Sequence, residues 1–155
     1  LPDFKQKMVQ IGYLARTANL LGIATPKIAC IAPSEQLLPN VISSTEGALL
    51  AKMADRGQLG NVVVDGPLSL DVALYKEVAE HKKVKGSSVA GDPDCLLFPN
   101  LESANVFFKS VTHLCGGELA AMVMGTKVPC VLTSRGDTSK TKLFSIALAC
   151  LAVKK

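Results

Sequence analysis

The sequence predicts an α/β protein in which helices cover both faces of a mostly parallel sheet, giving three layers of the order α/β/α. Short apolar runs that read as buried on both sides alternate along the chain with segments whose apolar residues recur at helical spacing. The composition agrees with a folded globular chain. Hydrophobic residues make up 48% of the 155 residues and charged residues 19%.

Helices are expected where apolar residues recur every three or four positions between capping residues. Serine and aspartate favour the start of a helix because their side chains accept hydrogen bonds from its first N–H groups, and glycine favours its end. In chain order, the expected helices are residues 4–21, closed by Gly22; a helix capped by Ser43 or Ser44 that reaches Met53 and ends at Gly57; a helix that begins at Ser69 or Asp71; residues 101–114; and residues 138–153.

Strands are expected where short apolar runs stop at turn residues. In chain order, the expected strands are residues 28–32; residues 61–64, stopped by Asp65-Gly66-Pro67; and residues 95–98, followed by Pro99. Two more short apolar runs, residues 120–124 and 130–132, precede the last helix, and the second of them also reads as a buried strand.

Ligands of such sheets bind beside the carboxyl ends of the strands, where loops lead into helices. This rule selects three loops, residues 65–67, 99–105 and 133–138. The last is the most suggestive, because Thr133, Ser134, Arg135 and Gly136 follow an apolar run directly. Hydroxyls and a guanidinium bind anions, a glycine lets backbone N–H groups approach, and a helix N-terminus favours negative charge.

Each of these groups of polar residues also has a purely structural explanation. Asp137, Thr138 or Ser139 could cap the last helix and would alone account for the polar loop. Residues 65–68 have the composition of a simple turn. Glu102, Asn105 and Lys109 share one face of a helix, and that face could line a site or simply be solvated.

Several function classes are disfavoured. The formal charge of +4 is modest and only 5% of residues are aromatic, so nucleic-acid binding is not expected. No apolar run approaches the roughly 18 residues of a membrane span, and no membrane partner is expected. His81, His113 and the cysteines lack metal-ligand spacing. Ser134 has no G-x-S-x-G elbow, and no G-x-G-x-x-G follows a strand.

The five cysteines contain no C-x-x-C pair, and all but Cys115 lie in apolar runs. We therefore expect buried, reduced thiols and a cytoplasmic protein. The chain begins at Leu1 rather than at a methionine, which raises the expectation that it is a piece of a longer protein.

Four segments together resemble the phosphate acetyl/butyryl transferase family, and the butyryl branch is the nearer one. The segments are "LLGIATPKIACIAPSEQ", "VVVDGPLSLDVAL", "VAGDPDCLLFPNLESANVFFKS" and "MVMGTKVPCVLTSRGDTSKTKLFSIALA". The resemblance covers residues 1–155 as one phosphate acyltransferase domain. It corresponds to about the C-terminal half of a two-domain family member, with the N-terminal half absent.

The resemblance implies an enzyme that moves a butyryl or branched acyl group between coenzyme A and phosphate through an acyl phosphate. Coenzyme A would be a substrate, with no permanently bound cofactor and no metal. Arg135 would hold the phosphoryl group, and Ser134 would hydrogen-bond the phosphate or the reacting carbonyl. The other residues implied to bind substrate are Thr133, Gly136, Asp65, Gly66, Pro67, Asn105 and Lys109. The family also implies a homo-oligomer, a dimer or larger.

Three positions depart from the family pattern. Thr141 stands where the acetyl branch has an aspartate proposed as the base for the thiol, which leaves thiol deprotonation unassigned. Phe108 replaces a frequent tyrosine, and Asn100 replaces a usual aspartate. An alternative is therefore a phosphotransacetylase-like domain that senses acyl-CoA without turning it over.

Overall fold

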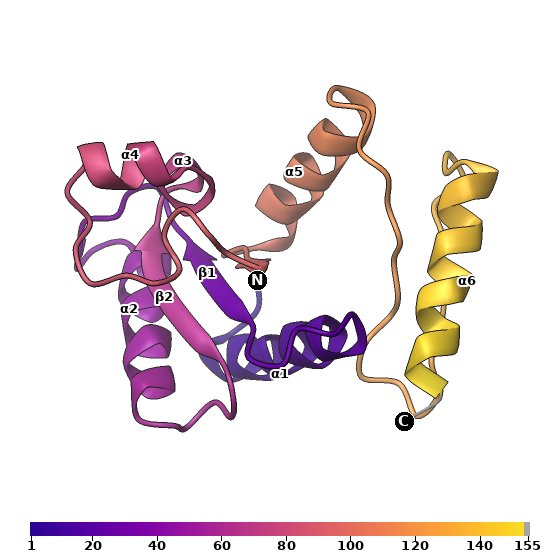
Figure 1. The fold of residues 1–155 in the computed structure, drawn as a ribbon, viewed down its shortest axis with the longest axis horizontal. Coiled ribbons are helices and arrows are strands. Elements are labelled where there is room, and N and C mark those ends of the chain that lie inside the picture. Colours follow the sequence, from indigo (N-terminus) through magenta and orange to yellow (C-terminus); the bar gives the residue numbers. More distant parts are fainter. Residues whose placement is uncertain (154–155) are drawn as a thin grey trace. The chain divides into compact units, whose positions relative to one another are not determined.

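The computed structural model describes residues 1–153 and divides into two units, Leu1–Ala104 (unit 1) and Asn105–Lys155 (unit 2). In chain order the elements are α1 (Phe4–Leu20), β1 (Lys27–Ile31), α2 (Ile42–Asp55), β2 (Val63–Leu68), α3 (Leu70–Leu74), α4 (Lys76–His81), β3 (Cys95–Leu97), α5 (Leu101–His113) and α6 (Ser139–Val153) (Figure 1).

The sheet of unit 1 has three parallel strands in the order β2-β1-β3. Ile28 of β1 lies beside Val64 of β2 on one side and beside Cys95 of β3 on the other. The central strand is the most deeply buried, since four of its five residues are buried and the fifth is half-buried. A buried run that is apolar on both faces is what a parallel sheet between helices requires.

Helices cover both faces of this sheet, so the predicted α/β/α layers are confirmed for unit 1 (Figure 1). On one face, Ile11 of α1 and Leu50 of α2 pack against Ile28 and Cys30 of β1. The other face is covered by α3 and α4 and the segment that follows them; its buried residues are Ala29, Ile31, Leu68, Val72, Ala73, Ala79 and Val89. Alternate residues of β1 thus serve opposite faces.

Helix α1 is capped at both ends by local sequence. The Asp3 carboxylate accepts a hydrogen bond from the Gln6 N–H, and the Gln6 side chain accepts one from the Asp3 N–H, both at 2.8 Å. This reciprocal pair is a capping box. Gly22 follows the helix with φ of +93°, a conformation that glycine adopts without a Cβ clash. The predicted extent of α1 is confirmed to within one residue.

The predicted N-cap of α2 is wrong. The helix begins at Ile42, and its N-cap position is Val41, which makes no side-chain cap bond. Ser44 lies inside the helix and is fully buried. Its hydroxyl accepts from the Leu38 N–H at 2.9 Å and donates to the Gln36 carbonyl at 3.0 Å. The serine therefore fixes the loop before the helix rather than the helix terminus.

Strand β2 continues through the residues that were expected to stop it. Asp65, Gly66 and Pro67 belong to the strand, which ends at Leu68, and the Gly66–Pro67 peptide is cis. The ladder with β1 shifts register between Ala29 and Ile31, which accommodates the proline. The predicted third helix starts at Ser69 as N-cap but is divided into the short helices α3 and α4.

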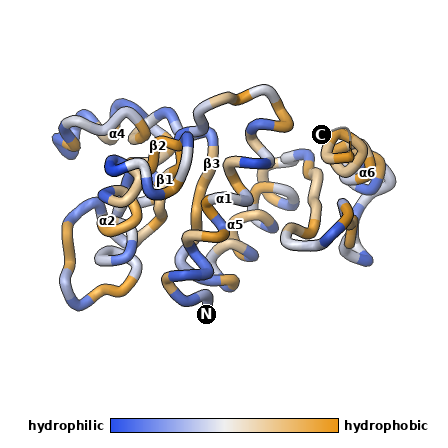
Figure 2. Tube along the Cα trace, turned by 90° about the horizontal axis from the view of Figure 1, so that it is seen from below, coloured by the Kyte–Doolittle hydropathy of each residue, from blue (hydrophilic) through white to orange (hydrophobic). Residues whose placement is uncertain are grey.

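Unit 2 contains α5 from Asn105 onward and all of α6, with a long irregular segment between them. Among residues 1–153, the apolar runs 120–124 and 130–132 form no strand, because the pairing they make is a single antiparallel bridge between Val123 and Cys130. Leu132 is 77% exposed. Helix α6 is apolar over most of its length (Figure 2) and, in the part that the structure describes, leaves Leu143, Ile146 and Val153 more than half exposed.

All five cysteines are free thiols, as the sequence predicted. The expected burial holds for Cys30 and partly for Cys95. Cys130 and Cys150 are exposed, contrary to expectation, because their apolar runs are not packed against described residues on all sides. Within residues 1–153, no helix is both long and apolar enough to cross a lipid bilayer.

Candidate active site

In the loop before α6, some polar residues cap the start of the helix, and the side chains of others take no part in capping. The Thr138 hydroxyl accepts a hydrogen bond from the Thr141 N–H at 3.1 Å, the geometry of an N-cap. Asp137 closes the preceding turn, because its Oδ2 accepts from the Ser134 N–H at 2.7 Å and its own N–H donates to the Ser134 carbonyl at 3.1 Å. The helix start is therefore capped without the side chains of Ser134 and Arg135.

Both of those side chains are available to a ligand. Within residues 1–153, neither the Ser134 hydroxyl nor the Arg135 guanidinium makes a hydrogen bond or an ion pair, and both residues are exposed, while Thr133 is half-buried. A Cβ built on Gly136 would meet nothing within 4 Å, so the backbone is open on that side. A hydroxyl, a planar set of donors and an accessible backbone beside the N-terminus of a 15-residue helix suit an oxyanion.

Asn105 and Lys109 lie on the exposed surface of α5, in the same unit as this loop. The Lys109 ammonium stands 4.7 Å from the centroid of the Phe108 ring. Asn100, which replaces the usual family aspartate, has a structural role. Its Oδ1 accepts from the Ser103 N–H at 2.8 Å and so caps the start of α5.

A cavity of about 300 Å³ lies in unit 2 between the end of α5 and the start of α6. Its volume is at the lower end of the range for small-molecule sites. It is lined by Phe108, Thr112, His113, Gly116, Gly117, Glu118, Leu119, Gly136, Asp137, Thr138, Lys140, Thr141 and Phe144. Gly136 is thus the expected site residue that borders this cavity.

Asp65, Gly66 and Pro67 belong to unit 1, and their visible role is in the sheet. A Cβ at Gly66 would lie 2.6 Å from the Cβ of Cys30 on the neighbouring strand, which is closer than real Cβ atoms come. The Asp65 carboxylate accepts a hydrogen bond from the Gly66 N–H at 2.8 Å, and Pro67 is buried. The absence of a side chain at Gly66 therefore lets β1 and β2 approach.

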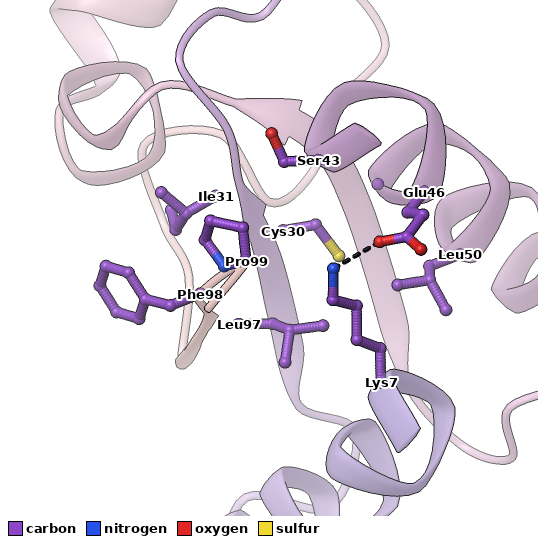
Figure 3. Close-up of a pocket in the computed structure, with 10 residues that line it drawn as sticks. Lys7, Cys30, Ile31, Ser43, Glu46, Leu50, Leu97, Phe98 and Pro99 are labelled. Carbon is purple, nitrogen blue, oxygen red and sulfur yellow. Dashed lines mark hydrogen bonds and ion pairs between the residues drawn. The ribbon is translucent and has the colours of Figure 1, made fainter. Parts of the chain in front are cut away.

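A smaller cavity of about 10 Å³ in unit 1, enough for one water-sized centre, is bordered by a buried ion pair (Figure 3). The Lys7 ammonium of α1 binds the Glu46 carboxylate of α2, and only 7% of the Lys7 side chain and 20% of the Glu46 side chain are exposed. Cys30 of β1 points into the same space (Figure 3). Burial, and then the charge of Asp65, raise the pKa of the Cys30 thiol to about 12.

A partly buried ion-pair network surrounds Ser69, the residue that follows β2. Lys82 lies 3.0 Å from an Asp71 carboxylate oxygen and 3.6 Å from one of Glu35. The Ser69 hydroxyl lies 3.3 Å from both Lys82 and Glu35. The Ser69 hydroxyl, followed by the Lys82 ammonium, lowers the pKa of Asp71 to about 2.

Sequence reasoning missed Lys7 and His113 as residues of interest. A signal for Lys7 was present, because it lies four residues before Ile11 on the apolar face of α1, where a lysine is unusual. For His113 no local pattern was available, since its cavity is closed by residues more than twenty positions away. Among residues 1–153, no group of three or more His, Cys, Asp or Glu side chains could hold a metal ion.

Residues 2–150 match the family model described as "Phosphate acetyl/butaryl transferase". Over 150 residues the chain is 44% identical to a phosphate butyryltransferase of Clostridium acetobutylicum, covering 97% of this chain and 50% of that protein. It is 40% identical over 148 residues to a phosphate acetyltransferase of Thermotoga maritima, covering 96% of this chain and 50% of that protein.

Among solved structures, a branched-chain phosphotransacylase from Enterococcus faecalis is similar in fold, with a TM-score of 0.88 and 32% sequence identity. That similarity covers 98% of this chain and 54% of the other. The chain therefore spans about half the length of the relatives it matches.

Proposed function

Because the chain belongs to the phosphate acetyl/butyryl transferase family, we propose that the protein transfers a short acyl group, butyryl or branched, between coenzyme A and inorganic phosphate. The observation that carries this proposal is the loop before α6. Its helix is capped by Thr138, while the Ser134 hydroxyl and the Arg135 guanidinium remain unengaged by residues 1–153 beside a helix N-terminus. That arrangement suits a phosphoryl group.

The proposed reaction needs neither a metal nor a covalent enzyme intermediate. The thiolate of coenzyme A attacks the acyl carbon of an acyl phosphate, the bond between that carbon and the phosphate oxygen breaks, and phosphate leaves. Negative charge grows on oxygen as the bond breaks. Arg135, the Ser134 hydroxyl and nearby N–H groups stabilise this charge, and the site holds the two reactants in line.

The remaining assignments are part of the same proposal. Thr133 and Gly136 flank the phosphoryl group, and Asn105 and Lys109 contribute donors from α5. Asp65, Gly66 and Pro67, which lie near the end of β2, are also proposed to bind substrate. Coenzyme A is a substrate on this proposal, not a resident cofactor.

We also propose a cytoplasmic location and a homo-oligomeric state. Five unpaired thiols suit a reducing compartment. Exposed apolar side chains such as Leu132 and Leu143 favour association with further protein surface. Light scattering tests the assembly, and a monodisperse monomer at high protein concentration contradicts it.

A second candidate function is acyl-CoA sensing without turnover. Thr141, in place of the carboxylate of the acetyl branch, favours it, because a hydroxyl is a far weaker base. The two functions differ in one measurement. Sensing gives saturable acyl-CoA binding with no phosphate-dependent release of the thiol.

The decisive assay follows thiol release from acetyl-, propionyl-, butyryl- and isobutyryl-CoA in the presence of phosphate. It uses the protein at the full length of its relatives. The 155 residues alone are expected to turn over slowly if at all, since the matched enzymes are about twice as long. Absence of release from all four substrates by the full-length protein contradicts the proposal.

A further inference from the structure

Ser134, Arg135, Gly136 and Asp137 form a turn whose two ends are joined by a pair of hydrogen bonds. The Asp137 N–H donates to the Ser134 carbonyl at 3.1 Å, and the Ser134 N–H donates to the Asp137 Oδ2 at 2.7 Å. Arg135 and Gly136 occupy the two central positions of this turn. Both backbone polar groups of Ser134 are therefore bound by Asp137.

This pattern of hydrogen bonds differs from an ordinary helix cap. A serine followed three residues later by an acidic residue is typical of a capping box, in which the serine hydroxyl accepts the N–H of the third residue. Here the Asp137 N–H binds the Ser134 carbonyl instead, and the Thr138 hydroxyl caps α6 by accepting from the Thr141 N–H. Asp137 is thus not needed as the N-cap, and neither of its bonds to Ser134 uses the serine hydroxyl.

The Asp137 carboxylate has two opposite effects on an anion bound at this turn. Its negative charge opposes a phosphoryl group held by Arg135. Its bond to the Ser134 N–H is charge-assisted, however, and such bonds are stronger than neutral ones. A loose turn would present the hydroxyl and the guanidinium together only part of the time, and apparent affinity falls in proportion to that fraction. A firmly held turn therefore favours binding.

We propose that Asp137 is a positioning residue, whose carboxylate holds the turn so that the Ser134 hydroxyl and the Arg135 guanidinium meet the phosphoryl group together. This inference rests on the proposed acyl transfer. Asp137 itself touches no substrate and acts through its neighbours. Its removal should therefore weaken the handling of phosphate mainly where Arg135 is present to be misplaced.

A double-mutant cycle at positions 135 and 137 tests this role in the protein at the full length of its relatives. Thiol release is followed with phosphate as the varied substrate and with the acyl-CoA that the wild type uses best. Asp137→Ala is expected to lower kcat/KM for phosphate by about 10-fold, through a higher KM for phosphate and an unchanged KM for acyl-CoA. In the Arg135→Ala background the same change should cost less than about 2-fold, because residues that act through one another are not additive.

Two further variants separate positioning from charge and from folding. Asp137→Asn keeps an oxygen that can accept the Ser134 N–H, and it should lose only about 3-fold because the bond becomes a neutral one. Thr138→Ala removes the N-cap of α6 and should lower the melting temperature while the KM for phosphate stays unchanged. Circular dichroism checks the folding of each variant, and Asp137→Asn replaces Asp137→Ala in the cycle if the alanine variant does not fold.

The outcomes separate this role from the proposed function. If Asp137→Ala loses nothing, or loses equally in both backgrounds, the positioning role is overturned while the proposed function stands. A lower KM for phosphate in Asp137→Asn also overturns it, since the carboxylate would then act by repelling the anion. If the full-length wild type releases no thiol from any of the four acyl-CoA substrates, the proposed function and this role fall together.

Discussion

The buried ion pair between Lys7 and Glu46 gives the sharpest stability prediction. Removing one partner of a desolvated pair leaves the other charge without compensation, which typically costs about 3–5 kcal/mol. A fifth of the Glu46 side chain still reaches solvent, so we expect the lower end of that range. Glu46→Ala should therefore lower the free energy of unfolding by about 3 kcal/mol.

The chain supplies a matched control on the same helix. Lys52 and Asp55 form a 3.4 Å pair whose side chains are 62% and 64% exposed. Such pairs contribute little, so Asp55→Ala should cost less than about 0.5 kcal/mol. The double variant Lys7→Met with Glu46→Leu should regain most of the lost stability, because an apolar pair of similar volume removes the uncompensated charge.

Urea denaturation followed by far-UV circular dichroism measures these differences, since the chain has no tryptophan. Hydrogen exchange of the α1 and α2 amides assigns the affected transition to unit 1. If Glu46→Ala costs no more than Asp55→Ala, the Lys7–Glu46 pair is not desolvated, and the reasoning is refuted.

Three further predictions concern the loop, the thiols and acid stability. Arg135→Ala should lower kcat/KM for phosphate by about 10- to 100-fold, the equivalent of losing hydrogen bonds to a charged group; Arg135→Lys should recover part of this, and an unchanged phosphate response would remove the arginine from the site. Iodoacetamide should label Cys30 last, because its pKa is raised to about 12 and it is buried; mass spectrometry showing early labelling would contradict this. The pKa of Asp71 is lowered to about 2, so its stabilising contribution is present above its ordinary pKa and is lost as pH falls from about 4 to 2; acid titrations should show that Asp71→Asn flattens stability in this window, and a wild-type slope there would exclude the effect.

The sequence predicted the parts of the fold that depend on local pattern. Helix α1 and strand β1 were expected nearly at their observed bounds, because a capping box, a closing glycine and a doubly apolar run are local signals. The cap at Ser44 failed because its hydroxyl bonds to residues 36 and 38, a tertiary arrangement that composition does not reveal.

The candidate site was likewise predicted where the signal is local and misjudged where it depends on tertiary contacts. The polar loop at Ser134 and Arg135 was visible because those residue types interrupt an apolar run directly before a helix. The length of β2 was misjudged, since Asp65-Gly66-Pro67 has turn composition and remains in the strand only because Gly66 fits against Cys30. The apolar run at residues 130–132 was read as a strand, but an apolar run forms a strand only where another strand pairs with it, and among residues 1–153 this run forms only one bridge, between Cys130 and Val123.

The contact between Gly66 and Cys30 also limits which substitutions the two positions can accept during evolution. Any residue larger than glycine at position 66 collides with the Cβ of position 30, so the two sites cannot drift independently. A mutational path toward alanine at 66 would first need glycine at 30, and the Cys30 carbonyl oxygen, 3.1 Å from the new Cβ, would still have to yield. Libraries that vary β1 and β2 separately should therefore return glycine at 66, and a designer who wants freedom on one strand has to redesign both together.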